Sequence, residues 1–251
     1  MNIPHIPVLY KETLEAFVNI NDGYIIDCTT GFAGHSSGLL TSNENVKLIC
    51  NDQDDEALKF SKERLEPYTQ RVIFNKGNFE HVIDTFKNYE IRGILADIGV
   101  SSLQLDKLDR GFGFDSNTLD MRMNQNQSLD AATVVNTYSL AELERIFKDC
   151  GEVREYKKVA SLILNNRPFR SAKEISELLG KKMPKGKIHP ATLPFQGIRI
   201  EVNDELGVLE RLFDSLENAK FKNCIVAIIS FHSLEDRIVK NYFKKWTKSC
   251  I

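Results

Sequence analysis

The chain has 251 residues, enough for one large domain or for a domain that carries a substantial insertion. Apolar residues make up 42% and charged residues 27%, the balance of an ordinary globular protein. The apolar run at 225–229 is far shorter than the roughly 18 residues that suggest a membrane span, and no secretory signal opens the chain. We therefore expect a cytoplasmic protein without membrane association. Five widely spaced cysteines with no C-x-x-C pair argue against disulfides and a zinc site, and we expect no metal.

Charge is distributed unevenly along the chain. The formal net charge is −2, but residues 151–190 contain ten Lys or Arg and four Glu, which gives this segment +6 and the rest of the chain −8. A basic segment on an acidic body favours an anionic partner that docks at one place. The alternative is a solvated helix face without a binding role.

Short β-branched or apolar runs alternate with helical patterns through the first hundred residues. They predict strands at 24–28, 46–51, 71–75 and 93–98. The clearest helix covers 54–65, where three acidic residues open the helix and its apolar residues share one face. This alternation indicates βαβ units and a parallel sheet.

The strand signal stops after residue 98 and returns near the C-terminus. In between, helix-like stretches lie near 139–149, 153–166 and 173–180. The pattern then resumes with a helix at 204–218, a strand at 224–231 and a helix from Ser233. We predict an α/β fold, a Rossmann-like parallel sheet with an inserted helical domain. The sheet domain is predicted at 1–103 and 206–251, and the insertion at 104–205.

Side chains suited to a ligand stand at the ends of successive predicted strands. The first strand ends in Asp27 and enters the loop 28–35, whose glycines let the backbone approach a ligand closely. The second ends in Asp52, where doubly wound folds place a carboxylate that accepts hydrogen bonds from the ribose of an adenine cofactor. Phe79 follows the third strand and is placed to cover the adenine, and Asp97 ends the fourth strand. For Asp52, helix capping is the alternative.

An adenosine-containing cofactor fits this pattern, and two features favour S-adenosylmethionine over NAD. The loop spacing is G-x-x-G, without the third glycine that seats a pyrophosphate on the helix, and no hydride-transfer constellation is present. S-adenosylmethionine has no phosphate and does not require the stricter turn.

Three further clusters have a structural and a functional interpretation. His232 should lie at the carboxyl end of the fifth strand, whereas Ser233 and Asp236 beside it fit a helix-capping box. Arg110 and Arg122, at the entry to the insertion, either meet phosphate or pair with nearby aspartates. Residues 189–203 are predicted as a loop and the entry to a packed helix, with a functional role as the alternative.

These segments resemble the ribosomal RNA small-subunit methyltransferase H family, also called MraW. The resemblance covers nearly the whole chain, and the motifs Leu-Asp-Met-Arg-Met at 119–123 and Ile-Ser-Phe-His-Ser-Leu-Glu-Asp-Arg at 229–237 are specific to that family. Other matching segments lie at 5–9, 27–36, 93–104, 189–192 and 195–203. The resemblance implies a class I methyltransferase that uses S-adenosylmethionine to methylate the N4 atom of a cytidine in 16S rRNA, in the decoding region of the small ribosomal subunit.

The resemblance also implies residue roles. The cofactor is expected to contact Ala33, Gly34, His35, Asp52, Phe79, Asp97 and Gln104. The sequence has no (D/N)-P-P-(Y/F) motif. We expect Asp97 or a backbone carbonyl of residues 97–100, or else His232, to draw on the amine N–H during catalysis. The RNA, with its target base unstacked, is expected to meet the insertion through Arg110, Arg122, Lys181, Lys182, Lys185, Lys187 and Arg199.

The family resemblance predicts a longer chain, because its members usually continue beyond the region of Lys240. An unpaired sheet edge at that side would favour association, and a homodimer is compatible with the sequence. Two other functions stay open. One is a small-molecule N-methyltransferase, which has no use for a basic insertion. The other is a non-catalytic ribosome- or RNA-binding protein with a vestigial cofactor pocket, because the C-terminal segment is missing.

Overall fold

The computed structural model describes residues 7–184 and 186–249, which form two compact units. One unit contains the described residues up to Gly99 together with those from Leu206 onward, and the other is Val100–Glu205. The division after Gly99 lies slightly before the predicted boundary at 103. We refer to them as the sheet unit and the helical unit.

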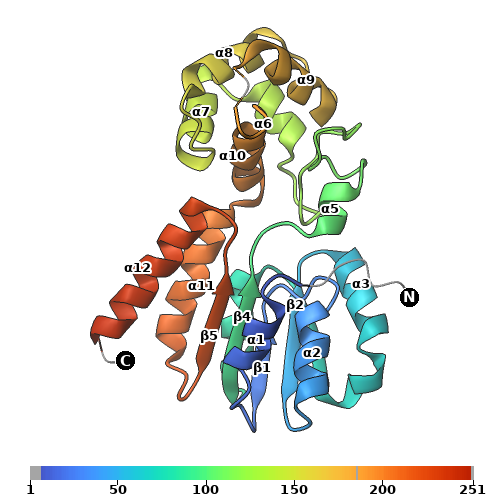
Figure 1. Ribbon diagram of the computed structural model, residues 1–251, viewed down its shortest axis with the longest axis vertical. Helices are drawn as coiled ribbons and strands as arrows, with labels where there is room; N and C mark the ends of the chain where they lie inside the picture. Colours follow the sequence, from blue (N-terminus) through green and yellow to red (C-terminus); the bar gives the residue numbers. More distant parts are fainter. Residues whose placement is uncertain (1–6, 185, 250–251) are drawn as a thin grey trace. The chain divides into compact units, whose positions relative to one another are not determined.

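The sheet unit is built on five parallel strands (Figure 1). They are β1 (Tyr24–Asp27), β2 (Lys47–Asp52), β3 (Val72–Lys76), β4 (Ile91–Asp97) and β5 (Ile225–Ile229), in the order β3-β2-β1-β4-β5. All five predicted strands and the predicted α/β class are confirmed. The chain winds outward from β1 in both directions, so the switch point of the sheet lies at the carboxyl end of β1, where open α/β sheets bind their ligands.

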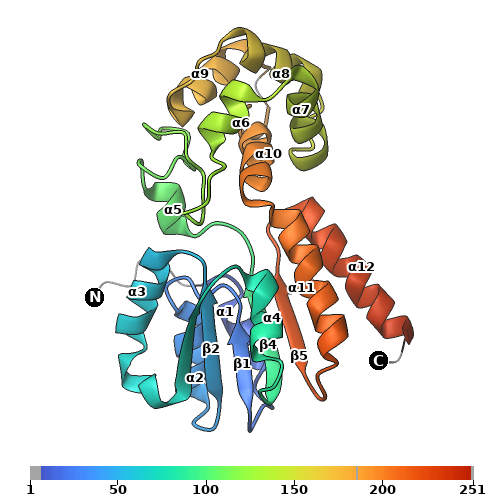
Figure 2. The same ribbon diagram turned by 180° about the vertical axis from the view of Figure 1, so that it is seen from behind.

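Successive side chains along each strand point to opposite faces of the sheet, and both faces are covered by helices. Ile25, Leu48 and Leu95 pack on one face under α1 (Tyr10–Ala16) and α2 (Gly34–Ser42), which stand before the sheet in Figure 1. The other face is covered by α4 (Val82–Phe86) and α11 (Glu205–Ala219), with α12 (Ser233–Ser249) beside α11 (Figure 2). Burial on both faces explains why the strands read as continuous apolar runs.

Further short elements complete the sheet unit. The helix α3 (Asp55–Arg64) follows β2, and two 3₁₀ helices, η1 (Glu66–Arg71) and η2 (Phe79–His81), flank β3. Among the described residues, no helix is both long and apolar enough to cross a bilayer.

The helical unit packs its helices around a core of its own. Its elements are α5 (Ser102–Asp106), α6 (Ala131–Thr137), α7 (Leu140–Arg145), the π-helical turn η3 (Ile146–Cys150), α8 (Tyr156–Asn165), α9 (Ala172–Lys182) and α10 (Thr192–Asn203). The helix α10 lies directly on η3, because a Cβ at Gly197 would stand 3.0 Å from the carbonyl oxygen of Ile146. The prediction of a loop leading into a packed helix at 189–203 understated α10, which has 12 residues.

Candidate active site at the carboxyl edge of the sheet

Asp27, at the end of β1, is a buried anchor for the loop that follows it. Its side chain is 2% exposed. The hydroxyl of Ser36 donates to Oδ2 at 2.6 Å, and the N–H of Thr29 donates to Oδ1 at 3.3 Å. Burial raises the pKa of Asp27 to about 6 in spite of these bonds. Asp27 therefore fixes the loop 28–35 from beneath.

Asp52, at the end of β2, is held by backbone groups on both sides. The N–H of Gly31 donates to Oδ2 at 2.8 Å, and that of Asp54 donates to Oδ1 at 2.9 Å. The helix cap is Asp54, whose carboxylate accepts the N–H of Glu56 at 2.9 Å. Capping therefore does not account for Asp52. Each of its oxygens keeps a second acceptor site, and burial raises its pKa to about 6.

Asp97, at the end of β4, carries an unsatisfied oxygen. Its N–H donates to the hydroxyl of Thr29 at 2.8 Å, which ties it to the β1 loop. Its side chain is 24% exposed, yet within the described part of the chain its buried Oδ1 has no hydrogen-bond partner. Burial, followed by repulsion from Asp27 and Glu235, raises the pKa of Asp97 to about 7. This carboxyl is thus poised to change protonation near neutral pH.

His35 lies beside Asp97, and its surroundings favour the neutral ring. Its Nε2 stands 3.0 Å from the carbonyl oxygen of Val8, and a carbonyl only accepts, so Nε2 carries the proton. Its Nδ1 is 3.7 Å from Oδ2 of Asp97, too far for a hydrogen bond. Burial lowers the pKa of His35, which favours the uncharged ring.

The loop keeps its shape through Ala33 and Gly34. Ala33 has φ +55°, a left-handed conformation that glycine adopts without strain. Gly34 lies against Pro7, and a Cβ there would overlap the proline ring. These two residues therefore shape the backbone of the loop 28–35.

Phe79 and Gln104 lie apart from these carboxyl groups in the chain. Phe79 opens η2 and is partly buried against the apolar cluster beneath α4 and α11. Gln104 belongs to α5 of the helical unit, where its Oε1 accepts the N–H of Ser101 at 3.0 Å.

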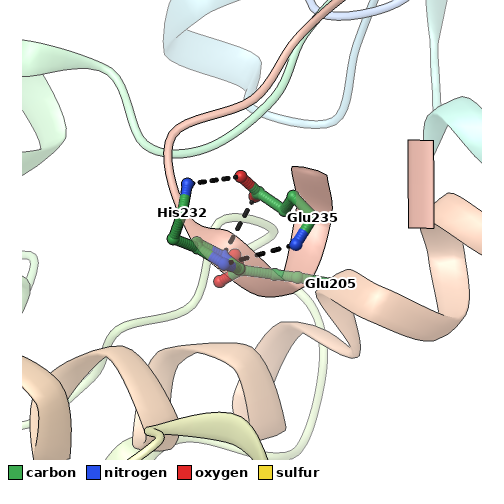
Figure 3. A group of neighbouring side chains, drawn as sticks. All are labelled: Glu205, His232 and Glu235. Atoms are coloured by element: carbon green, nitrogen blue, oxygen red, sulfur yellow. Dashed lines mark hydrogen bonds and ion pairs between the residues drawn. The ribbon is translucent and has the colours of Figure 1, made fainter. Parts of the chain in front are cut away.

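His232 is engaged with Glu235 (Figure 3). Its Nε2 is 3.2 Å from Oε1 of Glu235, and the N–H groups of Phe231 and His232 donate to Oε2 at 2.9 and 3.3 Å. The expected capping pair was therefore wrong by one position: Glu235 takes these N–H groups, whereas Asp236 pairs with Lys240 at 2.7 Å. Among the described residues, the buried Nε2 of His232 has no hydrogen-bond partner, as is also true of Oδ1 of Asp97, so both side chains stay candidates for the acceptor of the amine N–H.

The three arginines expected to meet RNA make local contacts. Arg110 is buried and donates to the carbonyl oxygens of Arg122 and Met123, at 3.0 and 3.2 Å. Arg122 pairs with Asp120 at 2.8 Å. Arg199 forms a two-pronged pair with Glu205, at 2.8 and 2.9 Å. For Arg122 the contacts favour the local pairing considered above.

The expected lysines lie near the end of α9 and beyond it. Lys181, Lys182 and Lys187 are exposed, and Lys181 is 3.5 Å from Glu177. Lys185 lies outside the described residues. All three ammonium groups are thus at the surface, and that of Lys181 has an exposed carboxylate as its neighbour.

Sequence reasoning missed Thr29, Ser36 and Glu235. The hydroxyl of Ser36 donates to the carboxylate of Asp27, and the hydroxyl of Thr29 accepts the backbone N–H of Asp97. Glu235 accepts the N–H of Phe231 just after β5. The only sequence signal was their position next to the predicted strand ends.

The chemistry of this edge suits a cationic ligand with hydroxyl groups. Burial is the first cause of the raised pKa values of Asp27, Asp52 and Asp97, and repulsion from Asp27 raises the pKa values of the other two further. A ligand with positive charge would relieve this repulsion, whereas a phosphate would increase it. The unpaired Oδ1 of Asp97 adds an acceptor that a donor group would satisfy.

Comparison with known proteins identifies the family. The sequence matches the profile of the MraW methylase family over residues 2–251. The chain belongs to the MraW methylase family. It is 83% identical over 251 residues to "Ribosomal RNA small subunit methyltransferase H" of Aliarcobacter butzleri, covering 100% of this chain and 84% of that protein. The proteins of the same name from Sulfurimonas denitrificans and Campylobacter jejuni (serotype O:6) are 58% and 54% identical, with 99% and 100% of this chain and 83% of each relative covered.

Proposed function

We propose that this protein transfers the methyl group of S-adenosylmethionine to the N4 amine of a cytidine in 16S rRNA of the small ribosomal subunit. The shared name of its relatives supports small-subunit rRNA as the substrate. The choice of a cytidine, of its N4 atom and of the decoding region rests on the family resemblance. The observation that carries the chemistry is the unpaired Oδ1 of Asp97 at the switch point of the sheet.

The residues of the carboxyl edge fit the methyl donor, which supplies an electrophilic sulfonium methyl group when bound. Asp52 would accept the two ribose hydroxyls with the free acceptor sites of its oxygens. Phe79 would lie against the adenine, and the backbone of 31–35 would line the ligand. Gln104 is proposed to complete the pocket. The acidic character of the edge matches the positive charge of the donor.

Asp97 is proposed to act on the amine. The lone pair of a cytosine N4 amine is delocalised into the ring, which makes the nitrogen a poor nucleophile. When the new N–C bond forms and the bond from the methyl carbon to sulfur breaks, the nitrogen becomes positively charged and must lose a proton. An ionised Asp97 would accept a hydrogen bond from the amine N–H, localise the lone pair and take up the charge that develops. Holding nitrogen and methyl carbon in line supplies much of the remaining rate.

The helical unit is proposed to hold the RNA. The segment 151–190 carries +6 on a chain of net charge −2, and Lys181, Lys182 and Lys187 are exposed there. Arg110, Arg122 and Arg199 would contribute by fixing the fold of the unit, given their local partners. A ribosomal substrate implies a cytoplasmic protein.

Two other functions are less well supported. If the protein were a small-molecule N-methyltransferase, its basic segment 151–190 would have no binding role. A non-catalytic binding protein does not fit the membership of a methylase family or the complete set of Asp27, Asp52 and Asp97 at the sheet edge.

The experiment is transfer of labelled methyl from S-adenosylmethionine to small ribosomal subunits and to free cytidine. We expect labelled subunits and no labelled cytidine. Asp97→Asn should lower the rate by about 100-fold or more, the usual loss when a transition-state partner is removed. The control is Asp84→Asn on α4, an exposed carboxylate 3.9 Å from Lys87, which should keep wild-type activity. Unlabelled subunits, or equal labelling of cytidine, would contradict the proposal.

A further inference from the structure

Phe231 is an exposed aromatic residue at the carboxyl edge of the sheet. It is 55% exposed, whereas Ile229 before it and Leu234 after it are buried. A single exposed apolar side chain is common on protein surfaces. Its position therefore decides whether it has a role.

The ring of Phe231 lies next to the exit of β4. In the parallel pairing of the two strands, Asp97 stands opposite Ile229, and Ile98 donates its N–H to the carbonyl of Ile229 at 3.0 Å. Two residues further along each strand, a Cβ at Gly99 would stand 3.3 Å from Cδ2 of Phe231. Gly99 has φ +116°, which disfavours any side chain there. The ring thus occupies space that a glycine keeps open, two residues from Asp97.

The backbone that carries this ring is fixed by a buried carboxylate. Glu235 is 2% exposed, and its Oε2 accepts the N–H groups of Phe231 and His232 (Figure 3). These bonds hold the start of α12 and restrict where Phe231 can stand. A rigid aromatic side chain loses little conformational entropy on binding a flat ligand.

We propose that Phe231 is the stacking surface for the target base, next to Asp97. The inference rests on the proposed function, because it concerns the base that is methylated there. A base that leaves its RNA stack loses contact with its neighbours, and an aromatic ring replaces that contact whatever the base. Phe231 would supply affinity for the extruded base, while Asp97 engages its exocyclic amine. Stacking of one base on an aromatic side chain accounts for about 5- to 150-fold in affinity.

The test compares Phe231→Ala, Phe231→Leu and Phe231→Tyr in methyl transfer to small ribosomal subunits. The leucine variant keeps an apolar side chain and loses the flat ring, whereas tyrosine keeps the ring. We expect kcat/KM to fall about 10- to 100-fold for the alanine and leucine variants, mainly through a higher KM for subunits, and by less than about 3-fold for tyrosine. Affinity for S-adenosylmethionine, measured by calorimetry, should be unchanged in all three, because the ring is not assigned to the cofactor.

Each outcome bears on a different claim. An active wild type with an equally active leucine variant would overturn the stacking role alone. A loss of cofactor affinity in the leucine variant would also overturn it, because the ring would then support the fold of the pocket. A wild type that does not methylate subunits would overturn the proposed function, and this inference with it.

Discussion

Single residues at the carboxyl edge differ in their pKa values, and that of Asp97 is raised toward neutral pH. Its pKa is raised to about 7, chiefly by burial. Below that pH the carboxyl group is protonated and donates instead of accepting, so it cannot take the amine proton. We therefore expect log kcat/KM to rise with a slope near one up to about pH 7 and then to level off. Burial lowers the pKa of His35, which favours its uncharged ring beside Asp97.

The measurement is a pH profile of methyl transfer from pH 5.5 to 9, with Asp97→Asn as the reference variant. The residual activity of that variant should show no such rise, since an amide does not titrate. A wild-type profile that is flat across this range would remove Asp97 as the ionising acceptor.

At the same scale, the sequence predicted which residues stand at the sheet edge but not what each one does there. The strand-end rule located Asp27, Asp52 and Asp97 correctly. It could not predict that both carboxylate oxygens of Asp27 accept hydrogen bonds from Ser36 and Thr29, because those bonds depend on the path of the loop. Nor could it foresee that Glu235 holds His232, since neighbouring acidic residues at the start of a helix look alike in sequence.

Among the elements of the sheet unit, α3 sets the position of Asp52. Its cap Asp54 is 8% exposed and accepts the N–H of Glu56, while its own N–H holds Asp52. Replacing Asp54 by alanine removes the cap and should lower the free energy of unfolding by about 1 kcal/mol in urea denaturation.

The matched control for this element is Asp55→Ala. Asp55 pairs with Lys76 at 2.6 Å, but both side chains are largely exposed. Removal of such a surface pair should cost less than about 0.5 kcal/mol. Equal losses in the two variants would show that α3 does not depend on Asp54 as its cap.

Sequence patterns predicted amphipathic elements better than fully buried ones. The helices α3, α8 and α9 each expose one face, and their periodicity was visible. The helix α10 buries residues on several sides, among them Phe195, Ile198 and Ile200, so its apolar pattern has no polar face to mark it. The π-helical turn that ends α7 was likewise unseen, because a single wide turn leaves no periodic signal.

For the molecule as a whole, the uneven charge should appear in the salt dependence of RNA binding. Each phosphate contact on single-stranded RNA contributes about 0.7 to the slope of log affinity against log salt concentration. Replacing Lys181, Lys182 and Lys187 by alanine should therefore make this slope shallower by about 2. The control replaces three exposed lysines outside the segment 151–190: Lys11, Lys59 and Lys244. Equal changes of slope in the two triple variants would assign RNA binding to overall charge rather than to the basic segment.

The central claim is that the edge around Asp97 methylates an exocyclic amine. Its most direct test is nucleoside analysis by mass spectrometry of 16S rRNA from small subunits treated with the protein and labelled S-adenosylmethionine. We predict that the label is recovered as N4-methylcytidine, and that Asp97→Asn abolishes this product. Label recovered on a ribose 2′ oxygen or on a ring carbon would contradict the account, because neither acceptor presents an amine N–H to Asp97.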